Sequence, residues 1–259
     1  ACGVVITLTL ALTVSWTEPL LHECCVTMVD VGQGQSVILQ SNGKTYIVDC
    51  GGNSGEYAAD QTASYLLGHG ISRVDGIILT HYDEDHCGGI PYLLDRIDAD
   101  QLFVPKTEGW ESQLSLLVQG MDMPVKPVEE DLLLTYGTTG VTLIAPDTYI
   151  SDNDSSICVL FQTENCDILI TGDRGELGEM LLLHDHELPK LELLIAGHHG
   201  SSSSTGEELL AATDPETVFI SVDENNRYGH PSDKLLARLE KIGCRVYRTD
   251  LHGTLIFWR

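Results

Sequence analysis

Positive charge is what this sequence has least of. Its 259 residues include 14 Lys and Arg against 39 Asp and Glu, and the formal net charge is −25. A protein that clamps duplex nucleic acid normally presents a basic face, because contact with phosphates releases counterions. This composition therefore excludes an electrostatic duplex clamp as the main design. If the protein handles a polyanion, bound cations are the obvious means of offsetting the field.

The sequence also lacks the cysteine patterns of a disulfide scaffold or a small zinc site. Its eight cysteines are few for this length and include no C-x-x-C pair, which argues against a zinc ribbon or a thioredoxin-like site. Most of them lie in apolar runs, as Cys158 does, and are interpreted as small core residues. Whether a few of them pair, and which, stays open at this stage.

The N-terminus has no Met, no leading basic residue and no run long enough to span a membrane. Residues 1–17 are uncharged and mostly apolar or hydroxylated, but a signal peptide begins with basic residues and a full span needs about 20 apolar residues. Three interpretations are open: the tail of a membrane helix from a longer protein, a trimmed signal sequence, or a buried strand. The first two place the rest of the chain outside the cytoplasm.

From Cys25 onward, strands alternate with helices and no linker, charge block or low-complexity tract interrupts them. Strands are predicted at 25–32, 36–40, 44–52, 74–81, 101–105, 141–146, 156–163, 167–173, 191–199, 217–222, 244–249 and 253–258. Helices are predicted at 56–70, 89–97, 112–121, 175–184, 206–213 and 232–243. Two βα-rich halves predict two packed sheets with helices outside. We divide the chain into an apolar N-terminal segment, 1–24, and one domain, 25–259.

The strongest chemical signal is the segment His81-Tyr-Asp83-Glu-Asp85-His86, directly after an apolar strand. Its imidazoles and carboxylates are ligands for zinc, manganese or iron. So many ionisable groups at the end of a buried strand would be costly without a counter-charge. The segment therefore predicts a metal site. The alternative is a solvated acidic loop in which the histidines occur by chance.

Three further polar segments follow strands: Thr171-Gly-Asp173, His198-His199, and Asn226-Arg-Tyr228-Gly-His230. Each has a structural alternative, since Asp173 would serve equally as a helix cap and His230 as part of a loop at a helix start. In open α/β folds, however, ligands bind where the strand ends meet. The joint occurrence of these segments predicts one shared metal site.

The order of these motifs resembles the metallo-β-lactamase superfamily, and most closely the C-terminal hydrolase domain of ComEC-type competence proteins. The resemblance runs from about Val26 to the end of the chain. Its motifs are Asp30-Val-Gly-Gln-Gly, His81-x-Asp-x-Asp-His-x-Gly-Gly, Asn153-Asp-Ser-Ser156, Thr171-Gly-Asp, His198-His-Gly-Ser, Asn226-x-Tyr-Gly-His-Pro and Asp250-x-x-Gly-Thr. One departure is Gln35, where the family often has an acid, and it leaves the role of the preceding turn open.

The resemblance implies an αββα sandwich, two mixed sheets flanked by helices, with two divalent metal ions between the sheets. Motif position assigns six metal ligands: His81, Asp83, Asp85, His86, Asp173 and His198. Asp173 would bridge the metals, and of the two adjacent histidines His198 is favoured. Asp83 stands where hydrolytic β-lactamases have His, which argues against lactam hydrolysis and makes Mn²⁺ as plausible as Zn²⁺.

The remaining site roles also come from the resemblance. Asp49 and His199 are expected to support the ligands from a second layer. Contact with the substrate is expected from Ser155, Ser156, Asn226 and Tyr228. Asp85 would also position the attacking water, and His230 would contact the phosphate or protonate the leaving oxygen.

The implied function is a metal-dependent phosphodiesterase, a DNA nuclease that degrades one strand during DNA uptake in natural transformation. Single-stranded DNA suits the acidic chain better than duplex. The implied partner is a membrane channel domain N-terminal to this chain, and the implied location is the extracytoplasmic face of the membrane, with secretion as the alternative. Two other functions are open: a hydrolase of small phosphodiesters or other esters, and a non-catalytic binding domain of a membrane channel.

Overall fold

The computed structural model describes residues 4–5, 22–119, 123–145 and 153–259. The interpretation of residues 1–17 falls outside these ranges except for two residues, and so does most of the segment 1–24. Among the helices of the described ranges, none has the length and apolarity needed to cross a membrane.

The first sheet has seven strands in the order β16-β1-β2-β3-β5-β7-β8. They are β1 (Cys25–Met28), β2 (Val37–Ser41), β3 (Lys44–Val48), β5 (Gly76–Ile78), β7 (Leu102–Pro105), β8 (Val125–Val128) and β16 (Leu255–Trp258). Pairing is antiparallel from β16 to β3 and parallel from β3 to β8. The sheet is therefore mixed, as predicted.

The second sheet also has seven strands, in the order β15-β14-β13-β12-β11-β10-β9. They are β9 (Leu132–Tyr136), β10 (Thr139–Ile144), β11 (Cys158–Gln162), β12 (Asp167–Ile170), β13 (Leu193–Ile195), β14 (Thr217–Ile220) and β15 (Arg245–Arg248). Pairing is antiparallel from β9 to β12 and parallel from β12 to β15. A small separate pair joins β4 (Arg73–Val74) to β6 (Asp98–Ala99).

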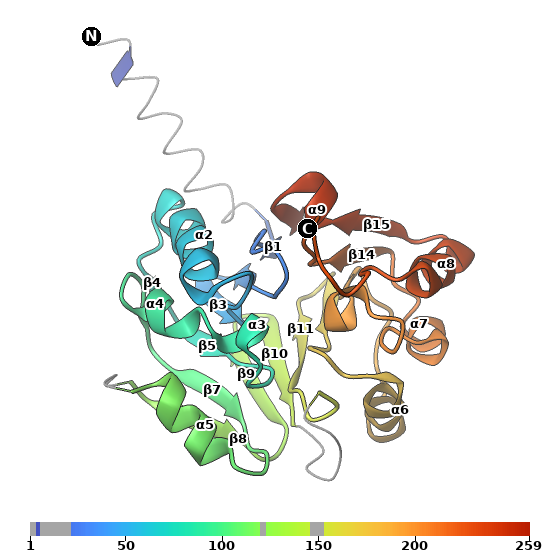
Figure 1. Ribbon diagram of the computed structural model, residues 1–259, viewed down its shortest axis with the longest axis horizontal. Helices are drawn as coiled ribbons and strands as arrows, with labels where there is room; N and C mark the ends of the chain where they lie inside the picture. Colours follow the sequence, from blue (N-terminus) through green and yellow to red (C-terminus); the bar gives the residue numbers. More distant parts are fainter. Residues whose placement is uncertain (1–3, 6–21, 120–122, 146–152) are drawn as a thin grey trace.

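Helices lie on the outer side of each sheet (Figure 1). The first sheet is covered by α2 (Gly55–Gly68), α4 (Ile90–Leu94) and α5 (Trp110–Leu117), and the second by α6 (Glu176–Asp185), α7 (Glu207–Thr213) and α8 (Asp233–Ile242). Three short turns of helix stand at loops: α3 (Glu84–Cys87), η2 (Gly197–Gly200) and α9 (Thr249–His252). This arrangement confirms the αββα sandwich.

Alternating side chains build the layers. Val37 and Leu39 of β2 belong to the core between the sheets, whereas Ile38 belongs to the core beneath the helices. On β12, Ile170 points inward and Leu169 outward. Because successive side chains of a strand face opposite ways, strands buried on both faces are continuous apolar runs. These runs are what made the central strands predictable.

The prediction missed the edge strands β8 and β9. In β8, Lys126 is exposed and Pro127 replaces an amide donor, a combination tolerated only at a sheet edge. In β9, half-buried and exposed positions alternate within Leu132–Tyr136 and none is fully buried, so the apolar pattern is weak. These two edge strands therefore carry a weaker pattern than the central ones, whereas the edge strands β15 and β16 lie within predicted ranges.

The alternative interpretation of Asp173 as a helix cap is wrong. The N-cap of α6 is Gly175, which has no capping side chain of its own. Oδ1 of Asp154 accepts hydrogen bonds from the amides of Gly175, at 2.8 Å, and Gly178, at 3.3 Å. A carboxylate from another loop thus satisfies the first turn of α6, and Asp173 is left for the site.

Candidate metal centre

The polar residues singled out in the sequence gather at one edge of the sandwich. Asp49 follows β3, His81 follows β5 after a short extended stretch, and Asp173 follows β12. His198 and His199 lie in η2, directly after β13. Since β3 runs parallel to β5, and β12 parallel to β13, these carboxyl ends open toward the same edge.

His86, on α3, stands at the centre of the cluster and is fully buried. Its Nε2 lies 3.0 Å from Oδ1 of Asp173 and 3.2 Å from Nε2 of His199. Two groups of ligand atoms result, each with its atoms within 4.8 Å of one another: His81, His86 and Asp173, and Asp85, His86 and His199. Because His86 belongs to both groups, the two candidate positions adjoin.

Partners on the far side of the rings decide where the protons sit. Nδ1 of His86 lies 2.7 Å from Oδ2 of Asp49, and Nδ1 of His199 lies 3.2 Å from the carbonyl oxygen of Ser221. Both partners can only accept hydrogen bonds, so in the neutral rings each Nδ1 carries the hydrogen. Each Nε2 then turns a lone pair toward the cluster, the tautomer that metal-binding histidines use.

In this neutral tautomer, the ring nitrogens that face the cluster have no hydrogen to share. The lone pairs of His86 and His199 meet at 3.2 Å. Among the described residues, Nε2 of His81 and Oδ1 of Asp173 are buried with no assigned hydrogen-bond partner, and Nε2 of His86 lies 3.0 Å from that Oδ1. Buried electron pairs that face one another are unfavourable unless a cation joins them. The donor set of imidazoles and carboxylates therefore fits a divalent metal.

The electrostatics of the cluster also favour positive charge at its centre. Burial opposes a charge on His86, but the carboxylates of Asp173 and Asp49 outweigh it and raise the His86 pKa well above its usual value. Burial likewise opposes charge on Asp173, yet His86 and His199 hold the pKa of Asp173 well below its usual range. For Asp85, burial is outweighed by the contact with His199 and the charge of His86, and its pKa falls to about 2.

Asp49 is the anchor of this network. It is fully buried, and besides His86 it accepts hydrogen bonds from the amide and hydroxyl of Thr80, both at 2.7 Å, and from Nε2 of Gln35 at 2.8 Å. The Thr80 hydroxyl also lies 3.1 Å from Nδ1 of His81. This finding gives the Gln35 departure a physical reason, because an amide can donate to Asp49 where a second carboxylate would repel it.

The turn before Gln35 packs against the backbone of the ligand segment. A Cβ on Gly34 would lie 2.4 Å from the carbonyl oxygen of Gly51, and a Cβ on Gly51 would lie 2.3 Å from the carbonyl carbon of Asp85. The amide of Gln35 donates to the carbonyl of Asp85 at 3.0 Å, and that of Cys50 to the carbonyl of His86 at 2.8 Å. Glycine is needed here because two backbones approach each other directly.

Three site residues have left-handed backbone conformations: Asp49 with φ 61°, His198 with φ 48° and His199 with φ 53°. Such conformations cost about 1–3 kcal/mol for ordinary residues and concentrate at functional sites. Two consecutive left-handed residues redirect the rings from the strand end into the cluster. Only the structure could reveal this, because neither histidine carries a conformational signal in the sequence.

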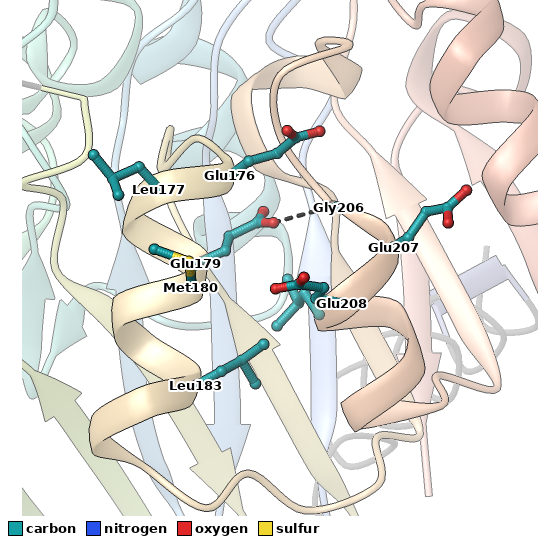
Figure 2. Close-up of a pocket in the computed structure, with 9 residues that line it drawn as sticks. Glu176, Leu177, Glu179, Met180, Leu183, Gly206, Glu207 and Glu208 are labelled. Carbon is teal, nitrogen blue, oxygen red and sulfur yellow. Dashed lines mark hydrogen bonds between the residues drawn. The ribbon is translucent and has the colours of Figure 1, made fainter.

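Hydrogen bonds from α6 fix the loop that bears these histidines. The amide of Gly197 donates to Oγ1 of Thr205 at 2.9 Å, and the amide of Thr205 donates to Oε1 of Glu179 at 2.5 Å. Figure 2 shows Glu179 pointing from α6 toward Gly206, whose amide donates to Oε2 at 2.8 Å. Burial raises the pKa of Glu179 to about 7, although these amides and Arg238 favour its charge. Glu179 therefore fixes the end of the loop at Thr205 and Gly206, and the Thr205 hydroxyl links that end to Gly197.

A second layer of rings borders the cluster on its exposed side. Nε2 of His198 lies 3.5 Å from Oδ2 of Asp173, and its ring is 5.8 Å from that of His230. His230 stacks in turn on Tyr228, at 5.7 Å between ring centroids, and Tyr228 is 71% exposed. Asn226 holds this loop, since its side chain bonds the amide and the carbonyl of His230 at 2.9 and 2.7 Å. Both polar atoms of the Asn226 side chain are therefore engaged in holding the backbone of this loop.

The pKa of His230 is lowered, first by burial and then by the charges of His198 and His199.

Asp83 differs from the other predicted ligands because its side chain is 55% exposed. Its Oδ2 lies 3.6 Å from Nε2 of His81, and this contact with His81 lowers the pKa of Asp83. A cavity of about 20 Å³ opens beside these two residues.

Ser155 and Ser156 are both buried. The hydroxyl of Ser156 donates to the carbonyl of Asn153 at 2.7 Å and accepts from the amide of Asp173 at 3.3 Å. Buried Arg174 donates to the carbonyl of Ser156 at 2.9 Å. These hydrogen bonds indicate that Ser156 stabilises the turn at Asp173. Contact of either serine with a substrate phosphate stays a prediction.

Four supporting residues escaped the sequence analysis: Thr80, Arg174, Glu179 and Thr205. Two of them had a usable signal. Arg174 directly follows a predicted ligand, and Glu179 is a carboxylate within the apolar run of a predicted helix. Charged residues at such positions need partners when buried. Thr80 and Thr205 had no signal, since threonine is common in strands and loops.

Similar proteins are consistent with this architecture. ComE operon protein 3 of Bacillus subtilis is 31% identical to the chain over 251 residues, which cover 89% of this chain and 32% of that protein. Competence protein ComA of Neisseria gonorrhoeae is 29% identical over 245 residues, or 91% of this chain and 32% of that protein. The chain thus spans about a third of the length of these curated relatives.

Among solved structures, the metallo-beta-lactamase fold protein YhfI from Bacillus subtilis matches with a TM-score of 0.62 at 14% identity, over 91% of this chain and 99% of that one. A diphosphatase from the PhnP family matches with a TM-score of 0.53 at 12% identity, over 91% and 98% of the two chains. At such identities the likeness concerns the fold alone. A family model described as the metallo-beta-lactamase superfamily matches residues 29–222. The chain therefore belongs to the metallo-β-lactamase superfamily and is homologous to these competence proteins.

Proposed function

We propose that this chain is a metal-dependent phosphodiesterase that cleaves DNA, with single strands as its substrate. The observation that carries the proposal is the pair of ligand groups that share His86. Adjoining sites for two divalent ions suit the displacement of an oxygen at phosphorus, because attacking and leaving oxygens both carry charge. Homology to competence proteins supports DNA as the substrate.

We assign one metal position to His81, Asp83 and Asp173 and the other to Asp85, His86 and His199, with Asp173 close to both. This assignment prefers His199 to His198. His199 is buried with Nε2 3.3 Å from Oδ2 of Asp85, and its Nδ1 faces a carbonyl. His198 is partly exposed and belongs to the second layer of rings, together with His230. Mn²⁺ and Zn²⁺ both suit this mixture of carboxylates and imidazoles.

Bound divalent ions would supply an activated water and charge stabilisation at the phosphate. The chain's own residues would orient the water and bind the phosphate. Asp85, ionised far below neutral pH, would hold the water by accepting its hydrogen bond. His230, whose pKa is lowered, is neutral at pH 7 and suits a hydrogen bond to a phosphate oxygen better than release of a proton.

Tyr228 favours a single strand. Its exposed ring lies on His230, so a base stacked on Tyr228 would place its phosphate near the second layer of rings. Base–aromatic stacking is worth about 1–3 kcal/mol and needs no sequence preference. The net charge of −25 opposes DNA binding, so we propose that a channel domain of a longer protein delivers the strand at the extracytoplasmic face of the membrane.

Digestion of end-labelled single-stranded DNA with Mn²⁺ tests the proposal. Cleavage should stop with EDTA and in Asp85→Ala, and it should persist in Asp75→Ala, whose carboxylate binds Lys44 away from the cluster. Labels at either end would show the polarity. A chain that demonstrably holds metal, leaves DNA intact and hydrolyses a small phosphodiester would instead be a small-ester hydrolase. A chain that holds no metal would be a binding domain.

A further inference from the structure

The structure brings two distant cysteines together in the core between the sheets. Cys24 directly precedes β1 and Cys166 directly precedes β12, so they belong to different sheets. They are 0% and 2% exposed and lie in the same hydrophobic cluster. Their thiols lie close enough for Cys24 to influence the pKa of Cys166. None of the described cysteines forms a disulfide in the structure.

The neighbouring residues hold these cysteines in place. The carboxylate of Glu23 accepts hydrogen bonds from both the amide and the side chain of Asn165, each at 2.8 Å. The residue before Cys24 is therefore tied to the residue before Cys166. The backbone of Cys24 also pairs in both directions with Arg259, at 3.3 and 3.1 Å. These hydrogen bonds therefore hold the backbone around the two cysteines in fixed relative positions.

We propose that Cys24 and Cys166 form a disulfide that links the two sheets. A low-molecular-weight disulfide such as oxidised glutathione would be the oxidant. The thiolate of one cysteine attacks it, releases one reduced thiol and forms a mixed disulfide. The thiolate of the other cysteine displaces the second reduced thiol, so both protein thiols lose a proton and the oxidant gains two electrons. The inference is independent of the proposed hydrolase activity.

The proximity of Cys24 and then burial raise the pKa of the Cys166 thiol. Only the thiolate attacks a disulfide, and a buried neutral thiol reacts slowly. We therefore expect the bond to form while the chain folds or opens locally. Refolding in a glutathione redox buffer is the appropriate condition for the experiment.

The test is mass spectrometry of the whole chain refolded with reduced and oxidised glutathione, then alkylated in denaturant. The oxidised protein should leave six of its eight cysteines open to alkylation, and a non-reducing digest should contain one linked peptide pair bearing Cys24 and Cys166. The linked protein should melt on the order of 10 °C above its reduced form, because the bond closes a long loop. Eight alkylated cysteines, or a different linked pair, would overturn the proposal.

Cys25 provides a matched control, because a digest cannot separate it from Cys24. It lies in β1 next to Cys24, and successive residues of a strand face opposite ways. Cys25→Ser should keep the linked peptide pair, whereas Cys24→Ser should lose it. A linked pair that survives Cys24→Ser and disappears in Cys25→Ser would show that Cys25 forms the bond, and would refute the inference.

Discussion

Oδ2 of Asp49 lies 2.7 Å from Nδ1 of His86, and both side chains are fully buried. This contact fixes the ring that both ligand groups share. In the neutral ring it places the hydrogen on Nδ1 and leaves the lone pair of Nε2 at the point where the two groups meet. The metal affinity of the whole centre should therefore depend on a residue that does not itself face the metals.

Asp49→Asn should lower metal affinity by about 10- to 100-fold, as changes behind a metal-binding histidine do. An amide in place of the carboxylate cannot accept from Thr80, Gln35 and His86 together. Competition with a chromophoric chelator measures the affinity. Asp75→Asn is the matched control, because Asp75 also accepts hydrogen bonds but does so from Lys44 and Thr45. Equal affinities for the two variants would contradict the role of Asp49.

The two adjacent histidines should behave differently. His199→Ala should lose about one equivalent of bound metal, since it removes a buried nitrogen from one ligand group. His198→Ala should keep the metal, because His198 belongs to neither group. Elemental analysis after dialysis gives both stoichiometries. Metal loss in His198→Ala alone would return the assignment to His198.

His230→Gln should reduce kcat/KM on single-stranded DNA by about 10- to 100-fold, the worth of a hydrogen bond to a charged group. The metal content should stay unchanged, because His230 lies in the second layer of rings beside His198. Steady-state cleavage and elemental analysis, run on the same preparation, separate the two effects. A variant that loses its metal would show instead that His230 supports the centre.

Glu179 should make stability depend on pH. Its pKa is raised from 4.5 to about 7 in the folded chain, so between these pH values the folded state keeps a proton that the unfolded state releases. Stability from this residue is therefore present below pH 4.5 and is lost as pH rises to about 7. Relative to Glu179→Gln, the free energy of unfolding should fall by about 3 kcal/mol across this window.

Urea unfolding in the presence of chelator, at pH 4.5 and pH 8, compares the two proteins without the metal's own pH dependence. The chelator matters because protons also compete with metal at the histidines. Parallel pH profiles for wild type and Glu179→Gln would show that the folded carboxyl titrates normally.

Asp154→Ala should destabilise the chain by about 1 kcal/mol, the usual cost of losing a helix cap. Asp154 accepts from two amides of the first turn of α6, and these lose their partner in alanine. Urea unfolding measures the change. Asp154→Asn keeps an acceptor oxygen and should lie close to wild type, and a loss as large as that of alanine would mean that the charge, not the cap, matters.

Central strands and their polar ends could be predicted from the sequence because burial on both faces leaves a continuous apolar run. The run ending at His81 and the run ending at Thr171 are examples. The edge strands β8 and β9 could not be predicted, since β8 contains Pro127 and a lysine that faces solvent and β9 is only partly buried. Their place depends on which neighbour they pair with, and a local pattern does not contain that information.

The sequence by itself determined the alternation of strands and helices and the position of the polar residues after the strands, because hydrophobic periodicity is a local property. Only the tertiary structure decided which of His198 and His199 faces Asp85, why Gln35 is an amide, and that Cys24 meets Cys166. Each of these depends on a contact between segments far apart in the chain, or on a backbone turn such as the left-handed pair at η2. Such contacts are set by how the two sheets pack, which no single segment encodes.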